Sequence, residues 1–320
     1  MDRPPAPRPE GYLDRLPWPA VTHLAALAGV LAITFSPIFV RLSGLSPATV
    51  AFWRLAYALP FVFTAWLMVR GRDPRPLRSR AQAAAAGLFL AVDLFAWHHS
   101  IARIGAGPAT LVGATQVAFV GLVAWALYRE RPSRLTFAVL PVVLGGVALL
   151  SGLGAENAYG EQPLAGVLLG LGSALCYSCF LLLLRHSNRG HLAPSPGPLL
   201  DATLGALAGT AVLALFDPAF TLAPSWPAHG WLLALALVCH TAGWIWITGA
   251  LPRLPALEVS GLLLVQPAGA VVWAQLIFAE RLAPVQWAGV GVVLGGILVL
   301  VLWGAAHRPG PPVPIPEPLA

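Results

Sequence analysis

The feature that most constrains this chain is a series of ten apolar runs of about 20 residues, joined by short connections that carry Pro, Gly or Arg. A helix of about 20 residues spans the roughly 30 Å hydrocarbon core of a bilayer. The predicted spans are 21–41, 47–69, 81–102, 106–128, 135–153, 163–184, 198–216, 229–250, 256–278 and 284–304. We therefore expect an all-α integral membrane protein with ten transmembrane helices.

The composition excludes several other classes of protein. Charged residues make up only 10% of the chain, 58% is hydrophobic, and the mean hydropathy is +0.75. Soluble domains carry about 25% charged residues, so a pair of soluble domains is excluded. All 19 basic residues are Arg, and a chain without Lys cannot form the phosphate-binding motif of a P-loop ATPase. No motif predicts a cofactor or a metal site.

The distribution of Arg predicts the orientation in the membrane. With the N-terminus in the cytoplasm, fifteen Arg fall on the cytoplasmic side, while Arg41, Arg103 and Arg281 fall outside and Arg54 lies within a span. Cytoplasmic loops are enriched in basic residues, so both termini are predicted to be cytoplasmic. The net charge of +6 is explained by these loops, so we expect the lipid bilayer as a partner and no nucleic acid. Arg without Lys, with abundant Ala, Gly and Pro, indicates a GC-rich bacterial genome and hence a bacterial inner membrane.

An internal repeat relates the two halves of the chain at an offset of 150 residues. Residues 128–149 match residues 278–299, and upstream Gln116 falls on Gln266. Each half holds five predicted spans, and because five is odd, the second half enters the membrane from the opposite side. The sequence therefore predicts two inverted five-helix repeats, an arrangement that secondary transporters use to build a site near the midplane.

Several segments of the chain resemble the EamA family of the drug/metabolite transporter superfamily. They are AFWRLAYALP at 51–60, SIARIGAGPATLVGATQVAFVGLVAWALYRERPS at 100–133, LEVSGLLLVQPAGAVVWAQLIFAERLAP at 257–284, and LGG at 144–146 and 294–296. The resemblance implies a first EamA repeat at 20–155 and a second at 156–306. The flanking segments 1–19 and 307–320 are rich in Pro, so they are expected to be disordered tails. The resemblance also implies an exporter of amino acids or other small metabolites, and no enzymatic activity. Val117 stands where the family has the Pro on which a kink in the fourth helix would depend.

Asp93 is the acidic residue nearest the centre of any predicted span. Trp97 lies one helical turn away on the same face, and a carboxylate beside an indole suits a substrate ammonium group. Alternatively, Asp93 carries a proton, or it is a protonated packing residue. His98 follows Trp97 directly and either contacts substrate or forms an interhelical hydrogen bond.

Arg54 is the one Arg within a span. It is expected either to bind a substrate carboxylate or to extend its side chain to the outer surface. Gln116 and Gln266 are placed at matching depth in the two repeats, where they either contact a substrate or hold the repeats together. His240 and Trp244 repeat the spacing of Asp93 and Trp97 in the second half.

Two Glu-Arg pairs, Glu130-Arg131 and Glu280-Arg281, end the fourth and ninth spans and are expected to pair locally at the membrane interface. Two functions compete with transport of a small molecule. An integral membrane enzyme would need Asp-rich or His/Asp clusters near the interface, which the sequence lacks, and a membrane scaffold would not need polar residues in its spans. No oligomeric state is predicted.

Overall fold

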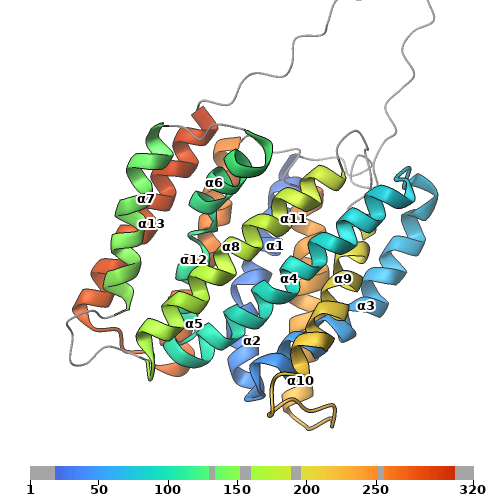
Figure 1. The fold of residues 1–320 in the computed structure, drawn as a ribbon, viewed down its shortest axis with the longest axis horizontal. Helices are drawn as coiled ribbons and strands as arrows, with labels where there is room; N and C mark the ends of the chain where they lie inside the picture. Colours follow the sequence, from blue (N-terminus) through green and yellow to red (C-terminus); the bar gives the residue numbers. More distant parts are fainter. Residues whose placement is uncertain (1–18, 130–133, 152–159, 189–195, 251–255, 307–320) are drawn as a thin grey trace, which may run out of the picture.

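The computed structural model of the protein describes residues 19–129, 134–151, 160–188, 196–250 and 256–306 (Figure 1). Within these ranges every regular element is helical. The α-helices are α1 (Pro19–Thr34), α2 (Ser36–Ser43), α3 (Pro47–Val69), α4 (Leu77–Ile104), α5 (Ala106–Gly113), α6 (Gln116–Tyr128), α7 (Arg134–Leu150), α8 (Pro163–Ser187), α9 (Pro196–Ala214), α10 (Ala228–Ala234), α11 (Trp244–Ala250), α12 (Ala256–Phe278) and α13 (Pro284–Ala306). A 3₁₀ helix, η2 (Arg70–Arg72), follows α3, and a π-helical segment, η3 (Leu235–Gly243), lies between α10 and α11.

The observed helices coincide with the predicted spans. Eight segments of the described chain are long and apolar enough to cross a membrane. Two shorter apolar helices, Arg134–Leu150 and Val265–Phe278, coincide with the predicted fifth and ninth spans. The prediction of an all-helical protein with many membrane-spanning segments is confirmed, and the count that length and composition support is eight spans.

The fourth span is broken in its middle, although Val117 replaces the Pro that would kink it. Helix α5 ends at Gly113, and α6 begins at Gln116. The Thr115 backbone N–H donates to Val112 O at 3.1 Å, and the Thr115 hydroxyl donates to the same oxygen at 2.7 Å. A Thr side chain that competes for a backbone carbonyl can bend a helix. The break thus coincides with the hydrogen bonds of Thr115 and occurs without a Pro at position 117.

The eighth span carries a different irregularity. Its central nine residues, Leu235–Gly243, are π-helical, and the Thr241 hydroxyl donates to Ala236 O, five residues back, at 2.9 Å. π-helical turns are rare and occur frequently at functional sites. His240 lies within this segment.

Helices from the two halves of the chain pack directly on each other. Helix α4 packs against α8 and α9, α3 against α9, α5 against α12, and α7 against α13. The pair α7 and α13 forms one edge of the bundle, and α3 and α9 lie toward the opposite edge (Figure 1). Glycines permit the closest crossings, since a Cβ at Gly87 or Gly205 would collide with the backbone of the facing helix.

Candidate functional site

Four ionisable side chains are buried together inside the bundle. Arg54 of α3 is 6% exposed, Asp93 and His98 of α4 are 7% and 1% exposed, and His240 of η3 is 2% exposed. Arg54 lies within electrostatic range of the other three. We call Arg54, Asp93, His98 and His240 the polar cluster. Burial of such groups in a membrane span is costly, so their clustering marks the best candidate site in the described chain.

Arg54 points into the bundle and does not reach the outer surface. Its Nε and Nη1 atoms are buried and have no hydrogen-bond partner among the described residues. Within the described residues, Arg54 forms no ion pair at 4 Å or less, although Asp93 is near enough to interact with it electrostatically. Extension of the Arg54 side chain to the surface is therefore wrong, and its guanidinium presents unused donors to the interior.

Asp93 is bound to the second half of the chain. The hydroxyl of Ser173, on α8, donates to Asp93 Oδ1 at 2.5 Å. Further along α4, the Ser100 hydroxyl donates to Gly166 O, also on α8, at 2.7 Å. The face of α4 that carries Asp93 therefore packs on α8. Trp97 lies 5.3 Å from His98 between ring centroids, and its indole is near Gly113 at the end of α5.

The two histidines of the polar cluster each use one ring nitrogen. His98 Nδ1 lies 3.3 Å from Pro47 O, and His98 Nε2 is buried with no partner in the described chain. His240 Nε2 lies 3.1 Å from Thr203 Oγ1 on α9. The other ring nitrogen, His240 Nδ1, is buried and has no hydrogen-bond partner in the described chain. Each imidazole is thus anchored at one edge and leaves a polar atom at the other.

The remaining predicted residues surround this cluster or lie away from it. Gln116 is the first residue of α6, directly after the break in the fourth span, and its Oε1 is buried without a partner among the described residues. Gln266 is partly buried in α12 beside Pro267. Trp244 packs edge-on against Tyr177 and Phe180 of α8, at 6.4 and 6.1 Å between centroids.

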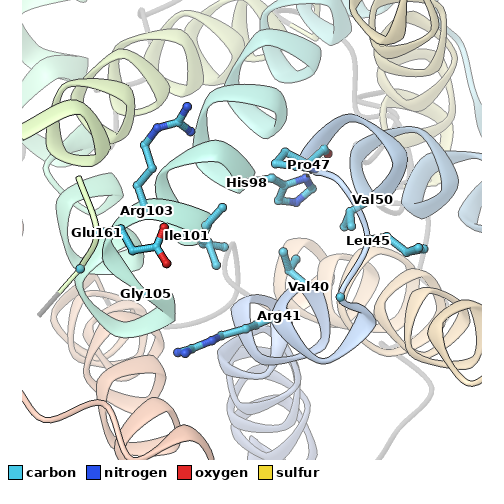
Figure 2. Close-up of a pocket in the computed structure, with 13 residues that line it drawn as sticks. Val40, Arg41, Leu45, Pro47, Val50, His98, Ile101, Arg103, Gly105 and Glu161 are labelled. Atoms are coloured by element: carbon cyan, nitrogen blue, oxygen red, sulfur yellow. Dashed lines mark hydrogen bonds between the residues drawn. The ribbon is translucent and has the colours of Figure 1, made fainter. Parts of the chain in front are cut away.

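A cavity of about 430 Å³ opens beside the polar cluster. It lies where the end of α2, the start of α3 and the end of α4 meet, and His98 is the member of the cluster that lines it (Figure 2). Arg41 and Arg103 lie on two sides of the cavity, with Glu161 near Arg103. We call this cavity the vestibule. It was not predicted from the sequence, because its residues come from three separate helix ends and a loop.

The vestibule is bordered by a contact between the two halves of the chain. Arg41 forms an ion pair with Glu280, whose carboxylate also accepts hydrogen bonds from the backbone N–H groups of Ala106 at 2.7 Å and Gly107 at 3.2 Å. Glu280 is 1% exposed. Burial raises its pKa, against the lowering effect of these partners. Local pairing of Glu280 with Arg281 is therefore wrong. Glu280 instead caps the N-terminus of α5, where a negative charge is favourable. Glu130 and Arg131 lie outside the described residues.

A second ionic contact joins the halves at the other end of α4. Arg75 lies 2.8 Å from Asp73 and 2.9 Å from Asp201 of α9, and Arg80 lies 3.2 Å from Asp201. The hydrogen bonds from Arg75 hold the pKa of Asp73 below its usual range. By the predicted orientation, this contact lies at the cytoplasmic end of the bundle and the Glu280 contact at the outer end.

Comparison with known proteins gives one family over nearly the whole chain. The model of the EamA-like transporter family matches residues 20–152 and again residues 164–302. An uncharacterized protein of Pseudomonas aeruginosa is 33% identical over 247 residues, which cover 76% of this chain and 81% of that protein. An uncharacterized transporter of Bacillus subtilis, YwfM, is 23% identical over 62% of this chain and 64% of its own length. One crystal structure, 18% identical, superposes with a TM-score of 0.57 over 90% of this chain and 96% of that one.

Proposed function

The chain belongs to the EamA-like transporter family and is a multi-pass membrane transporter, and on that premise we propose that it exports a small polar metabolite, such as an amino acid, by alternating access. In this proposal, ten helices form two inverted five-helix repeats, 20–155 and 156–306. The protein resides in a bacterial inner membrane with both termini in the cytoplasm, and it has no enzymatic activity.

The packing of the helices supports a two-fold relation between the halves, and the odd number of proposed spans in each half is what makes that relation inverted. A two-fold axis that exchanges the halves would bring the fifth span against the tenth and the fourth against the ninth, and α7 packs on α13 as α5 packs on α12. The same exchange would turn the contact between the third and sixth spans into a contact between the eighth and first spans. Helix α4 packs on α8, and η3 and α11 pack on α1. Exchange of two such halves would convert an outward-open form into an inward-open form.

The observation that carries the proposal is that the buried Nε and Nη1 of Arg54 have no hydrogen-bond partner among the described residues. Burial of a charge without hydrogen bonds lowers the free energy of unfolding, so it is not expected in a protein whose role is only structural. A ligand that enters the cluster would satisfy these donors. If the protein were a membrane scaffold, no ligand would be present to accept hydrogen bonds from these donors.

Asp93 is proposed as the proton-coupling residue. Its carboxylate bridges α4 and α8 through Ser173 and lies near Arg54, so a change in its protonation would alter a contact between the two repeats. A substrate ammonium group is the less favoured role, because Ser173 and Arg54 already interact with this carboxylate.

The test is export from cells that express the full chain or its Arg54→Gln variant at equal membrane levels. Cells are loaded with a panel of labelled amino acids, hydroxy acids and amines, and efflux is followed with and without a proton gradient. We expect one chemical class to leave faster with the natural chain and not with the variant. Equal efflux of every compound from both strains and from an empty-vector strain would overturn the proposal.

A further inference from the structure

The chemical identity of the substrate can be inferred from the hydrogen-bonding atoms that the polar cluster leaves unused. Arg54 offers only donors, and its Nε and Nη1 have no partner within the described chain. A carboxylate is the group that best matches a buried guanidinium, because it accepts two parallel hydrogen bonds and neutralises the charge.

The hydrogen bonds of His98 determine which of its ring nitrogens carries a proton. Nδ1 faces the carbonyl oxygen of Pro47 at 3.3 Å. A carbonyl can only accept, so Nδ1 must be the protonated nitrogen of the neutral ring. The unpartnered Nε2 is therefore a lone-pair acceptor.

The same reasoning applies to His240. The hydroxyl of Thr203 donates its hydrogen to Leu199 O at 2.7 Å, so Thr203 Oγ1 can only accept from His240 Nε2, which lies 3.1 Å away. Nε2 is thus protonated, and the unpartnered Nδ1 is an acceptor. Two neutral acceptors therefore lie within electrostatic range of the Arg54 guanidinium, two of whose nitrogens have no hydrogen-bond partner among the described residues.

The vestibule beside the cluster is lined by charges of both signs. Arg41 and Arg103 flank the vestibule, and His98 is among the residues that line it (Figure 2). This cavity lies at the predicted outer end, where an exported anion would leave past Arg103, while Arg41 is paired with Glu280 and the carboxylate of Glu161 also lines the cavity. The carboxylate of the polar cluster, Asp93, is held by Ser173 and lies near Arg54, so the cluster offers little free negative charge to an ammonium group.

We propose that the substrate is a small hydroxylated carboxylate, whose carboxylate binds Arg54 and whose hydroxyl groups donate to His98 Nε2 and His240 Nδ1. This inference rests on the proposed transport function and adds the substrate class. A hydroxyl group suits the two imidazoles because it can donate to a neutral acceptor without adding a second positive charge near Arg54.

The test measures ligand-induced thermal stabilisation of the purified full-length protein in detergent. The probes are glycolate, glycerate and gluconate, the amide of each acid, propionate as an acid without hydroxyl groups, and serinol as a hydroxylated amine. We expect at least one hydroxy acid to stabilise the protein, with its amide binding about tenfold or more weakly because the charged hydrogen bonds are lost. Propionate should also bind more weakly than the matching hydroxy acid.

Two variants separate the roles of the residues. Arg54→Gln should abolish the preference for acid over amide, whereas Arg185→Gln, at the exposed end of α8, should leave it unchanged. His98→Phe keeps an aromatic ring but removes the acceptor, so it should reduce the preference for hydroxy acid over propionate and retain the preference for acid over amide. This variant serves as the test if Arg54→Gln does not fold.

Stabilisation by serinol and not by any acid, or no stabilisation by any of the acids, would overturn the inference. Flux measured in proteoliposomes distinguishes this failure from that of the proposed function. If amines or amides are transported while hydroxy acids are not, the protein is a transporter and only the substrate class is wrong. If no compound of the panel is transported, the function itself is contradicted.

Discussion

The hydroxyl of Ser173 lies 2.5 Å from the carboxylate of Asp93, although the two residues are 80 positions apart in the chain. The bond joins the third span to the sixth, and so the first half of the protein to the second. It places the central carboxylate of the bundle at the boundary where the halves must move if access alternates.

The first prediction concerns Asp93. In Asp93→Asn, we expect exchange of substrate between the two sides to persist while concentrative transport driven by a proton gradient is lost. The amide still accepts the Ser173 hydrogen bond, so the packing of α4 on α8 is retained, but it cannot carry a proton. The measurement is counterflow and gradient-driven uptake in proteoliposomes.

Ser173→Ala is the matched control for that experiment. It removes a hydrogen bond to a charged group, worth about 1.5–3 kcal/mol, and should lower thermal stability without abolishing proton coupling. Gradient-driven transport by Asp93→Asn at the natural rate would contradict the proposed coupling role.

The second prediction concerns the outer contact. Glu280→Gln should lower the free energy of unfolding by about 1.5–3 kcal/mol, because the carboxylate binds Arg41 and two backbone N–H groups in a buried position. A Gln side chain has one acceptor oxygen, so its amide N–H₂ would face one of these donors. Thermal unfolding in detergent gives the change.

Glu161→Gln is the control for Glu280, since the Glu161 side chain is exposed at the edge of the same cavity. It should have little effect on stability. Equal thermal stability of Glu280→Gln and the natural protein would show that the contact with α5 does not stabilise the fold.

The third prediction concerns acid stability at the opposite end of α4. The pKa of Asp73 is lowered in the folded protein, chiefly by its hydrogen bonds from Arg75. The ionised carboxylate therefore stabilises the fold above about pH 4, the ordinary pKa of Asp, and this contribution is lost as the pH falls through the lowered value. Asp73→Asn should lower the melting temperature at pH 7.

At pH values below the lowered pKa of Asp73, the variant and the natural protein should converge in melting temperature. Asp217→Asn provides a comparison, because Asp217 lies in the connection after α9 and its carboxylate bonds the backbone of Ala219. A constant difference between Asp73→Asn and the natural protein at every pH would exclude ionisation of Asp73 as the cause.

The fourth prediction concerns the paired glutamines. Gln116→Leu should slow transport about two- to tenfold, the range expected for loss of one neutral hydrogen bond to substrate, while the protein remains folded in the membrane. Gln266→Leu should have a similar effect if the two side chains face one cavity from opposite repeats. Natural transport rates in both single variants would favour a role of the glutamines in holding the repeats together.

The fifth prediction concerns topology. Single cysteines introduced at Asp73 and Asn188 should be labelled only from the cytoplasm, and one at Glu161 only from outside, after Cys176, Cys179 and Cys239 are replaced. Labelling at Glu161 from the cytoplasm would contradict the inverted repeats, since the halves would then have the same orientation.

The sequence alone located the apolar helices. In hydrocarbon a backbone must satisfy its own hydrogen bonds, so length and apolar composition suffice to locate a helix. The fourth span, expected at 106–128, is made of α5 and α6, from Ala106 to Tyr128. The break at Thr115 was not predicted, because the Thr hydroxyl that bonds Val112 O there gives no signal as strong as Pro in the sequence.

The sequence also identified four of the buried ionisable residues, since the cost of a charge in a span makes Arg54, Asp93, His98 and His240 conspicuous. Which atoms they leave unused was decided only by the tertiary structure. Ser173 and Thr203 look like ordinary small residues of apolar helices, yet they fix Asp93 and His240. Glu280 likewise binds Arg41, 239 positions away. Such partners meet only when the two halves pack together, and no periodicity within one helix records that packing.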